Sequence, residues 1–128
     1  MRAYLDPFMW ESEIDTLASK YGEKVFIKWA TNRLNPMHAA LERFRTDVYS
    51  GDTFTHDGDE HVRTHLRNAV IRARALDPVT KQRRYVLGKP NDHQKIDFAM
   101  SSVLAHEAAM DAIAAGANAD AERNWVYY

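Results

Sequence analysis

Two carboxylates are candidates for chemistry because each occurs where a regular element is expected to end or begin. Asp6 closes the short apolar run RAYLD, and Asp97 precedes a long apolar helix pattern. Carboxylate oxygens are preferred by Mg²⁺ and Mn²⁺, and two-metal phosphodiester cleavage uses several carboxylates around ions roughly 3.5–4 Å apart. Taken as a pair, Asp6 and Asp97 predict a divalent-cation site.

Each carboxylate also has a structural interpretation, which is favoured when the residue is considered alone. Asp6 is followed by proline, so it is typical of a turn and is a candidate cap for the next helix. Asp97 is an acid in the first turn of a helix, where the helix dipole favours negative charge. Only the combination of the two favours metal binding.

The sequence lacks the motifs of several other kinds of catalytic or binding site. The Gly88-Lys89 pair is followed by proline and belongs to no phosphate-binding loop, and there is no G-x-S-x-G elbow. The absence of cysteine excludes disulfides and thiolate metal sites. His61 and His65 have the i, i+4 spacing of a helical zinc site, but the glutamate of H-E-x-x-H is missing, so surface or DNA-facing histidines are favoured.

The positive charge is concentrated in one segment. The chain has a net charge of −1, yet residues 61–95 carry nine Lys/Arg and two acids, which gives +7 there and −8 elsewhere. This segregation predicts an anionic partner, with nucleic acid the leading candidate. A solvated, arginine-rich hairpin without a partner is the alternative.

The first thirty residues predict the elements that position Asp6. Residues 2–8 (RAYLDPF) are expected to form a strand that ends at Asp-Pro. Residues 11–24 have apolar side chains at i, i+3, i+4 and i+7 and stop at Gly22, as an amphipathic helix does. Residues 24–30 (KVFIKWA) alternate like a second strand. Strand, helix and strand predict a parallel βαβ unit in an α/β domain.

The rest of the chain is expected to contain helices and a hairpin. In order, we predict a helix over 37–49, a turn at 55–59, a helix or helix-to-strand passage over 60–74, a hairpin with Asp77-Pro78 at its tip, and a helix from about 95 to 115. Two strands and a hairpin make a thin sheet for such a domain, so one edge is expected to be incomplete. Residues 1–116 are assigned to one domain and 117–128 to a C-terminal tail.

Three segments resemble the C-terminal part of the nuclease domain of tailed-bacteriophage large terminase subunits. They are YLDPFMWESEIDTLASKYG, FTHDGDEHVRTHLRNAVIRAR and KIDFAMSSVLAHEAA. That family has an Asp-Pro-aromatic strand end before a helix, a His-Asp-Gly turn leading to a helix that ends in Asn-Ala, and Lys-Ile-Asp opening its last helix. Each motif is weak alone, but all three occur here in order over roughly residues 3–116.

The resemblance implies a partial RNase H-like fold, with a parallel βαβ core, an added hairpin and a long C-terminal helix. It implies metal-dependent endonucleolytic cutting of concatemeric viral DNA during genome packaging, with Mg²⁺ or Mn²⁺ in a two-metal site. Asp6 matches the family's second acidic ligand, and Asp97 matches the acid that opens the last helix, so both are expected to be catalytic metal ligands. Structural or DNA-facing roles are expected for His56, Asp57, Gly58, Asn68 and Lys95. Double-stranded DNA is the expected partner, with phosphate contacts from Arg63, Arg67, Arg72, Arg74, Lys81, Arg83, Arg84 and Lys89.

The chain departs from the family in lacking the ATPase domain and the first nuclease strand with its catalytic aspartate. The isolated chain is therefore expected to be a weak or inactive nuclease. It is interpreted as a piece completed by a second polypeptide or a second copy, as a silent remnant, or as a non-enzymatic DNA- or protein-binding module. With no long apolar run and no signal-peptide core, it is expected in the host cytoplasm, neither secreted nor in a membrane.

Overall fold

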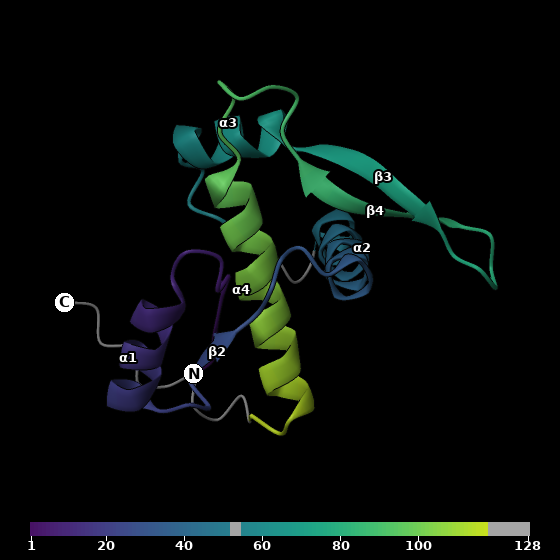
Figure 1. The fold of residues 1–128 in the computed structure, drawn as a ribbon. Helices are drawn as coiled ribbons and strands as arrows, with labels where there is room; N and C mark the ends of the chain where they lie inside the picture. The colour runs from purple at the N-terminus through teal and green to yellow at the C-terminus, as the bar shows by residue number, and fades with distance from the viewer. Residues whose placement is uncertain (52–54, 118–128) are drawn as a thin grey trace.

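The chain folds as a mixed α/β structure. A computed structural model describes residues 1–51 and 55–117, which form four helices and four strands (Figure 1). In chain order these are β1 (Ala3–Leu5), α1 (Glu11–Tyr21), β2 (Phe26–Lys28), α2 (Leu34–Ser50), α3 (Glu60–Asn68), β3 (Val70–Leu76), β4 (Arg83–Gly88) and α4 (Asp97–Ala114). The predicted tail, apart from its first residue, lies outside the described residues.

The predicted βαβ unit is confirmed at the N-terminus. β1 and β2 pair in parallel, with Tyr4 opposite Ile27, and α1 connects them and packs on β2. α1 ends at Gly22, whose φ of 113° is in a region that favours glycine and whose N–H donates to the carbonyl of Ala18. The position of Asp6 directly after a short parallel strand is therefore as predicted.

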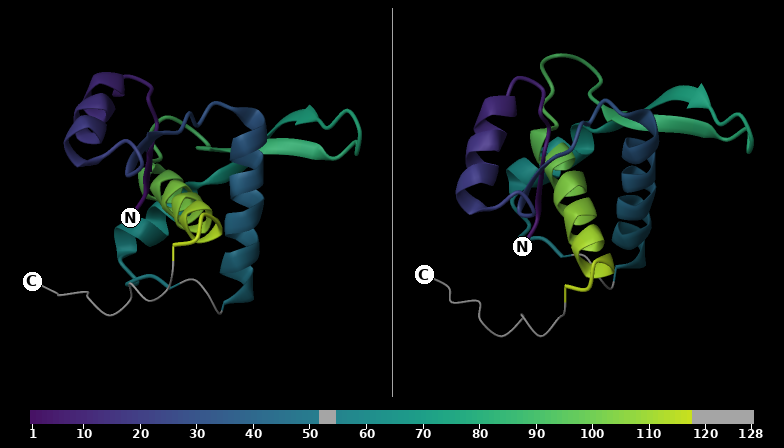
Figure 2. Two further views of the ribbon diagram at one scale, coloured as in Figure 1. Left: turned by 90° about the horizontal axis from the view of Figure 1, so that it is seen from below. Right: turned by 60° about the horizontal axis from the view of Figure 1, so that its bottom comes forward.

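The β3–β4 hairpin is also present, but it forms a sheet of its own. β3 and β4 pair antiparallel, with a register shift between Ala73 and Ala75. β4 packs against α2 and not beside β1 or β2, so the single thin sheet expected from the sequence is instead two separate pairs of strands. β3 is exposed along almost its whole length, and the hairpin projects beyond the helices (Figure 2).

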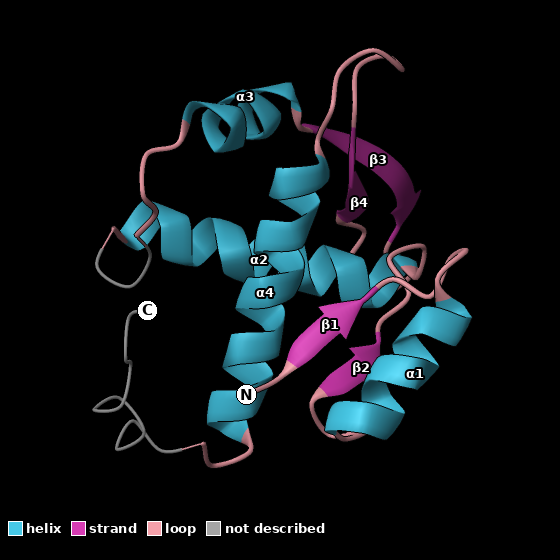
Figure 3. Ribbon diagram, turned by 90° about the vertical axis from the view of Figure 1, so that its left-hand side faces the viewer, coloured by secondary structure: helices cyan, strands magenta, loops and turns pink. Residues whose placement is uncertain are grey.

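The core lies where α2 and α4 meet. Met37 of α2 and Val103 of α4 are fully buried, and Trp29, from the segment after β2, closes the cluster. Partly buried side chains from β1 and β4 pack against it. α4 contacts α2, α3 and β1, which makes it the central element of the fold (Figure 3).

The long helices match their predictions to within a few residues. α2 begins three residues earlier than predicted because Pro36 falls within its first turn, where a missing N–H costs no helical hydrogen bond. Residues 60–74 were expected to form a helix or to pass from helix to strand. They pass from helix to strand, because α3 ends at Asn68 and β3 begins at Val70. None of the helices in the described part of the chain combines the length and the apolar character needed to cross a bilayer.

Candidate metal site and DNA-contact surface

Asp6 and Asp97 line the same pocket. The pocket has a volume of about 740 Å³ and is bounded by residues of β1, α1 and α4. Its walls are mainly apolar, with Ile14 and Leu17 on the α1 side and Leu104 on the α4 side. The structure therefore brings to one pocket the two carboxylates that the sequence pairs.

The start of α4 is oriented toward the end of β1 that leads into Asp6. The Tyr4 hydroxyl donates to the Asp111 carboxylate at 2.5 Å, which ties the last turns of α4 to β1. α4 then runs antiparallel to β1, so its first residue, Asp97, lies toward the end at which β1 leads into Asp6 (Figure 3). Burial and this hydrogen bond both raise the pKa of Tyr4, so its hydroxyl stays protonated as a donor.

Asp6 is held by two hydrogen bonds in the loop that follows β1. One carboxylate oxygen accepts from the Phe8 N–H at 3.1 Å, and the other accepts from the Thr31 hydroxyl. Asp6 does not cap α1, because the N-cap residue is Trp10 and it has no side-chain capping bond. Its carboxylate is oriented by Thr31 and retains lone pairs for a cation.

Asp97 is not the cap of α4. The N-cap residue is Ile96, without a side-chain capping bond, and the first-turn N–H of Phe98 donates to Nδ1 of His65 at 3.1 Å. The Asp97 carboxylate is exposed and has no hydrogen-bond or ion-pair partner within residues 1–51 and 55–117. It is therefore available to a cation.

The described residues contain no group of three or more His, Asp or Glu side chains that could hold a metal ion. Asp6 and Asp97 alone provide few ligands for Mg²⁺ or Mn²⁺, which take about six oxygens each, partly from water. A two-metal site here would need carboxylates beyond these two.

The predicted His-Asp-Gly turn builds the start of α3. Nδ1 of His56 accepts from the Gly58 N–H at 2.9 Å, and the Asp57 carboxylate accepts from the Asp59 N–H at 3.0 Å. Asp59 is the N-cap and accepts from the N–H groups of His61 and Val62. Asp59 was not among the predicted functional residues, although its position directly before the helix pattern EHVR is typical of a cap.

Asn68 and Lys95 meet at the junction between α3 and α4. The Asn68 side chain donates to the Lys95 carbonyl at 2.9 Å and accepts from Nε2 of Gln94 at 3.1 Å. Together with His65, these bonds fix the residues on either side of Asp97. His65 and Gln94 were missed as positioning residues because their partners lie in a different part of the chain.

The basic residues predicted to contact DNA are mostly engaged in local contacts. Arg63 and Arg67 lie 3.8 and 3.7 Å from Glu60, and Lys89 lies 3.3 Å from Asp92. The Arg72 guanidinium donates to the Lys89 carbonyl, and Nζ of Lys81 donates to the Pro78 carbonyl at 2.9 Å. Two exposed arginines have no such partner among the described residues: Arg74 of β3 and Arg83 of β4.

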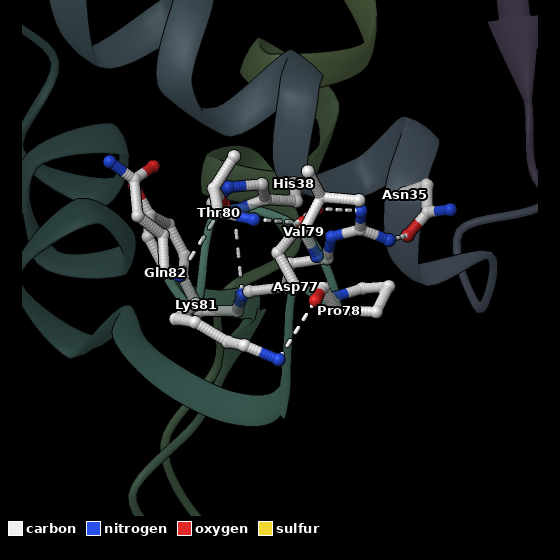
Figure 4. Close-up of polar contacts among 10 residues, drawn as sticks. Asn35, His38, Asp77, Pro78, Val79, Thr80, Lys81 and Gln82 are labelled. Carbon is white, nitrogen blue, oxygen red and sulfur yellow. Dashed lines mark hydrogen bonds and ion pairs between the residues drawn. The ribbon is translucent and has the colours of Figure 1, made fainter.

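Arg84 is built into the end of the hairpin. Its guanidinium donates to Asp77 at the turn and to Asn35 of α2, which anchors the hairpin to the first turn of that helix. Asp77 also accepts from the N–H groups of Val79 and Thr80, both at 2.8 Å (Figure 4). The Thr80 N–H, Arg84 and the Val79 N–H hold the pKa of Asp77 well below its ordinary value. Arg74 and Arg83 are therefore better placed than Arg84 to meet a DNA backbone.

Comparison of the chain with protein-family models, with curated proteins and with solved structures finds no match in any of the three.

Proposed function

We propose that this chain is the C-terminal portion of a large-terminase-type nuclease, a metal-dependent endonuclease that cuts concatemeric viral DNA during genome packaging. The observation that carries the proposal is that Asp6 and Asp97, which are far apart in the sequence, line one pocket. The ordered sequence motifs support the proposed family by resemblance, and the parallel βαβ unit with α1 and α4 beside it is compatible with a partial RNase H-like fold.

In such a site, different residues would bind the metal, orient its ligands and contact the DNA. Asp6 and Asp97 would hold Mg²⁺ or Mn²⁺, which supplies an activated water and stabilises the leaving oxygen of a phosphodiester. The Thr31 hydroxyl orients Asp6, and His65 and Asn68 fix the segment that carries Asp97. Arg74 and Arg83 would bind the DNA backbone, where phosphate contacts give position but no base specificity.

The site would be completed by another chain. β1 pairs only with β2 among the described strands, and a strand with an open edge is a template for pairing. A second polypeptide, or a second copy, that adds a strand ending in an acid would supply both the missing edge and a further ligand. The isolated chain is accordingly proposed to be a weak nuclease.

A non-enzymatic DNA-binding module is the second candidate. The observation that favours it is the exposed hairpin, which projects from the body and carries Arg74 and Arg83 without ion-pair partners in the described part of the chain (Figure 2). Such a module would bind DNA in a salt-sensitive way and would need neither Asp6 nor Asp97.

Plasmid nicking separates the two candidates. Supercoiled plasmid is incubated with Mn²⁺ and the wild type, Asp6→Asn, Asp97→Asn or, as a matched control, Asp92→Asn. Asp92 is also an exposed acid close to α4, but it does not line the pocket. We expect slow nicking by the wild type and by the control, and none by the other two. Equal nicking by all four proteins, or DNA binding by the wild type without any nicking, would contradict the nuclease proposal.

A further inference from the structure

The pocket that Asp6 and Asp97 line, here called the carboxylate pocket, has a smaller neighbour. This second pocket, the hairpin pocket, has a volume of about 390 Å³ and lies between the β3–β4 hairpin, α4 and the segment that joins β2 to α2. Met100 of α4 lines both pockets, so one side chain is common to their walls. Ligand pockets have volumes of about 300–1,000 Å³, so the hairpin pocket is large enough for a small ligand or for one unit of a larger one.

Much of the lining of the hairpin pocket is apolar. It includes Met37, which is fully buried, together with Val86, Leu87 and Met100, which are partly buried and pack against the core. The core therefore holds these four side chains in place. An apolar wall with a few polar groups is typical of a site for an organic ligand, since a bare ion makes no use of apolar contacts.

Arg74 is the one charged residue that lines the hairpin pocket in the described part of the chain. It is the extra residue of β3 at the register shift, because Ala73 and Ala75 pair with consecutive residues of β4. A bulge re-aims the side chain of such a residue and is common beside active sites. The Arg74 guanidinium has no hydrogen-bond or ion-pair partner among the described residues, whereas Arg72 donates to the Lys89 carbonyl. Arg74 therefore offers its donors to an anionic group of a ligand.

Two polar residues connect the hairpin pocket with the carboxylate pocket. Thr31 lines the hairpin pocket, and its hydroxyl donates to the Asp6 carboxylate. Asn32 follows it, is exposed and has no hydrogen-bond partner for its side chain within the described residues. The Asn32 amide has two donors. A ligand in the hairpin pocket therefore lies one residue away from a proposed metal ligand.

We propose that the hairpin pocket binds one nucleotide of a DNA strand whose neighbouring phosphodiester lies in the carboxylate pocket. Arg74 binds the phosphate of this nucleotide through charge-assisted hydrogen bonds, and Asn32 donates a further one. The apolar lining contacts the sugar and the base. The identification of the ligand as DNA rests on the proposed function. Nucleotide binding itself depends only on the hairpin pocket and requires neither a metal nor cleavage.

An NMR titration of the full-length protein with thymidine 5′-monophosphate in metal-free buffer tests this inference. In the wild type we expect the nucleotide to shift the amide signals of Thr31 and Leu87. Arg74→Gln should weaken binding about tenfold or more, which is the usual effect of losing a charge-assisted hydrogen bond. Arg83→Gln is the matched control, because Arg83 is an exposed arginine of the same hairpin that does not line the pocket. Arg83→Gln and Asp97→Asn should both bind like the wild type.

Two further ligands test whether the site takes a nucleotide of a strand. Inorganic phosphate should bind about tenfold more weakly than the nucleotide, because it makes no contact with the apolar lining. The trinucleotide of thymidine should bind about tenfold more tightly, because its additional phosphates also meet the basic hairpin.

Four outcomes would overturn the inference. They are unchanged binding in Arg74→Gln, an equal loss in Arg83→Gln, phosphate binding as tight as nucleotide binding, and a trinucleotide that binds no more tightly than the mononucleotide. The second would indicate general attraction to positive charge, the third an anion site, and the fourth a site for a free nucleotide. Because the titration contains no metal, its result is independent of plasmid nicking. Failure here with Mn²⁺-dependent nicking intact would refute the nucleotide site alone, and the reverse result would refute the nuclease alone.

Discussion

Two ionisable side chains are buried in the α2–α4 interface. His106 and Glu107 are each only 8% exposed. Nε2 of His106 lies 2.7 Å from the Asp47 carboxylate, and the Glu107 carboxylate lies 3.3 Å from the Arg43 guanidinium. Buried charges are tolerated only when they are paired. Burial raises the pKa of Glu107, and this effect exceeds the opposing effect of Arg43.

Replacing Glu107 by glutamine is expected to stabilise the protein at neutral pH. Because the folded-state pKa is above the unfolded one, ionised Glu107 lowers the free energy of unfolding as the pH rises from about 4.5 through the folded-state value. Glu107→Gln should therefore have the higher free energy of unfolding at pH 7, and the difference should shrink toward pH 4. Urea unfolding at both pH values measures this, with the exposed Glu42→Gln as the control. A loss of stability at pH 7 would show instead that the Arg43 ion pair dominates.

At the scale of elements, α3 determines where α4 begins. His65 accepts from the Phe98 N–H, and Asn68 binds the Lys95 carbonyl, so bonds from one helix hold the residues on both sides of Asp97. The free N–H groups at the start of a helix need such acceptors. One of these N–H groups, that of Phe98, donates to a histidine from another helix, and the Asp97 carboxylate has no hydrogen-bond partner among the described residues.

Removing this cap should weaken the α3–α4 junction. His65→Ala leaves the Phe98 N–H without its acceptor and is expected to lower the free energy of unfolding by about 0.5–2 kcal/mol, the usual cost of removing a helix cap. His93→Ala is the matched control, because the His93 side chain is exposed in the loop before α4. Thermal and urea denaturation measure both variants. Equal stability of the two would contradict a capping role for His65.

Local patterns were sufficient to predict the elements but not the contacts between them. The βαβ unit, the hairpin and α4 follow from periodicity, Gly22 and the Asp-Pro pairs, all of which act within a few residues. Asp6 and Asp97 line one pocket, and their joint role as metal ligands stays a prediction. In contrast, the anchoring of Arg84 to Asn35 depends on how the hairpin packs on α2, and no local pattern encodes that contact.

At the scale of the whole molecule, the basic hairpin is joined to the body beside α3 and the start of α4. The hairpin projects outward, while its base lies next to α3 and the first turn of α4, the end at which Asp97 is found (Figure 1). The segregation of +7 in residues 61–95 from −8 elsewhere makes the hairpin the part of the chain that is proposed to meet DNA.

DNA binding should depend on the two unpaired arginines of the hairpin. The double variant Arg74→Ala/Arg83→Ala is expected to weaken binding to any sequence and to reduce the slope of log K against log salt by about 0.9 for each phosphate that the protein no longer neutralises. The double variant Lys24→Ala/Arg45→Ala removes the same charge from exposed positions outside the hairpin and should keep the wild-type slope. Fluorescence anisotropy across a salt series gives both values. Identical slopes for the two double variants would show that the hairpin arginines do not contact DNA.

Mn²⁺ binding tests most directly whether Asp6 and Asp97 belong to one cation site. Paramagnetic Mn²⁺ broadens the NMR signals of amides near the place where it binds, so a titration of the full chain locates the ion without any requirement for cleavage. We predict that the amides of Phe8 and Phe98 broaden together at the lowest Mn²⁺ concentrations. This effect should disappear in Asp97→Asn and Asp6→Asn and persist in Asp92→Asn. Broadening at only one of the two amides, or an unchanged titration in Asp97→Asn, would contradict a shared site.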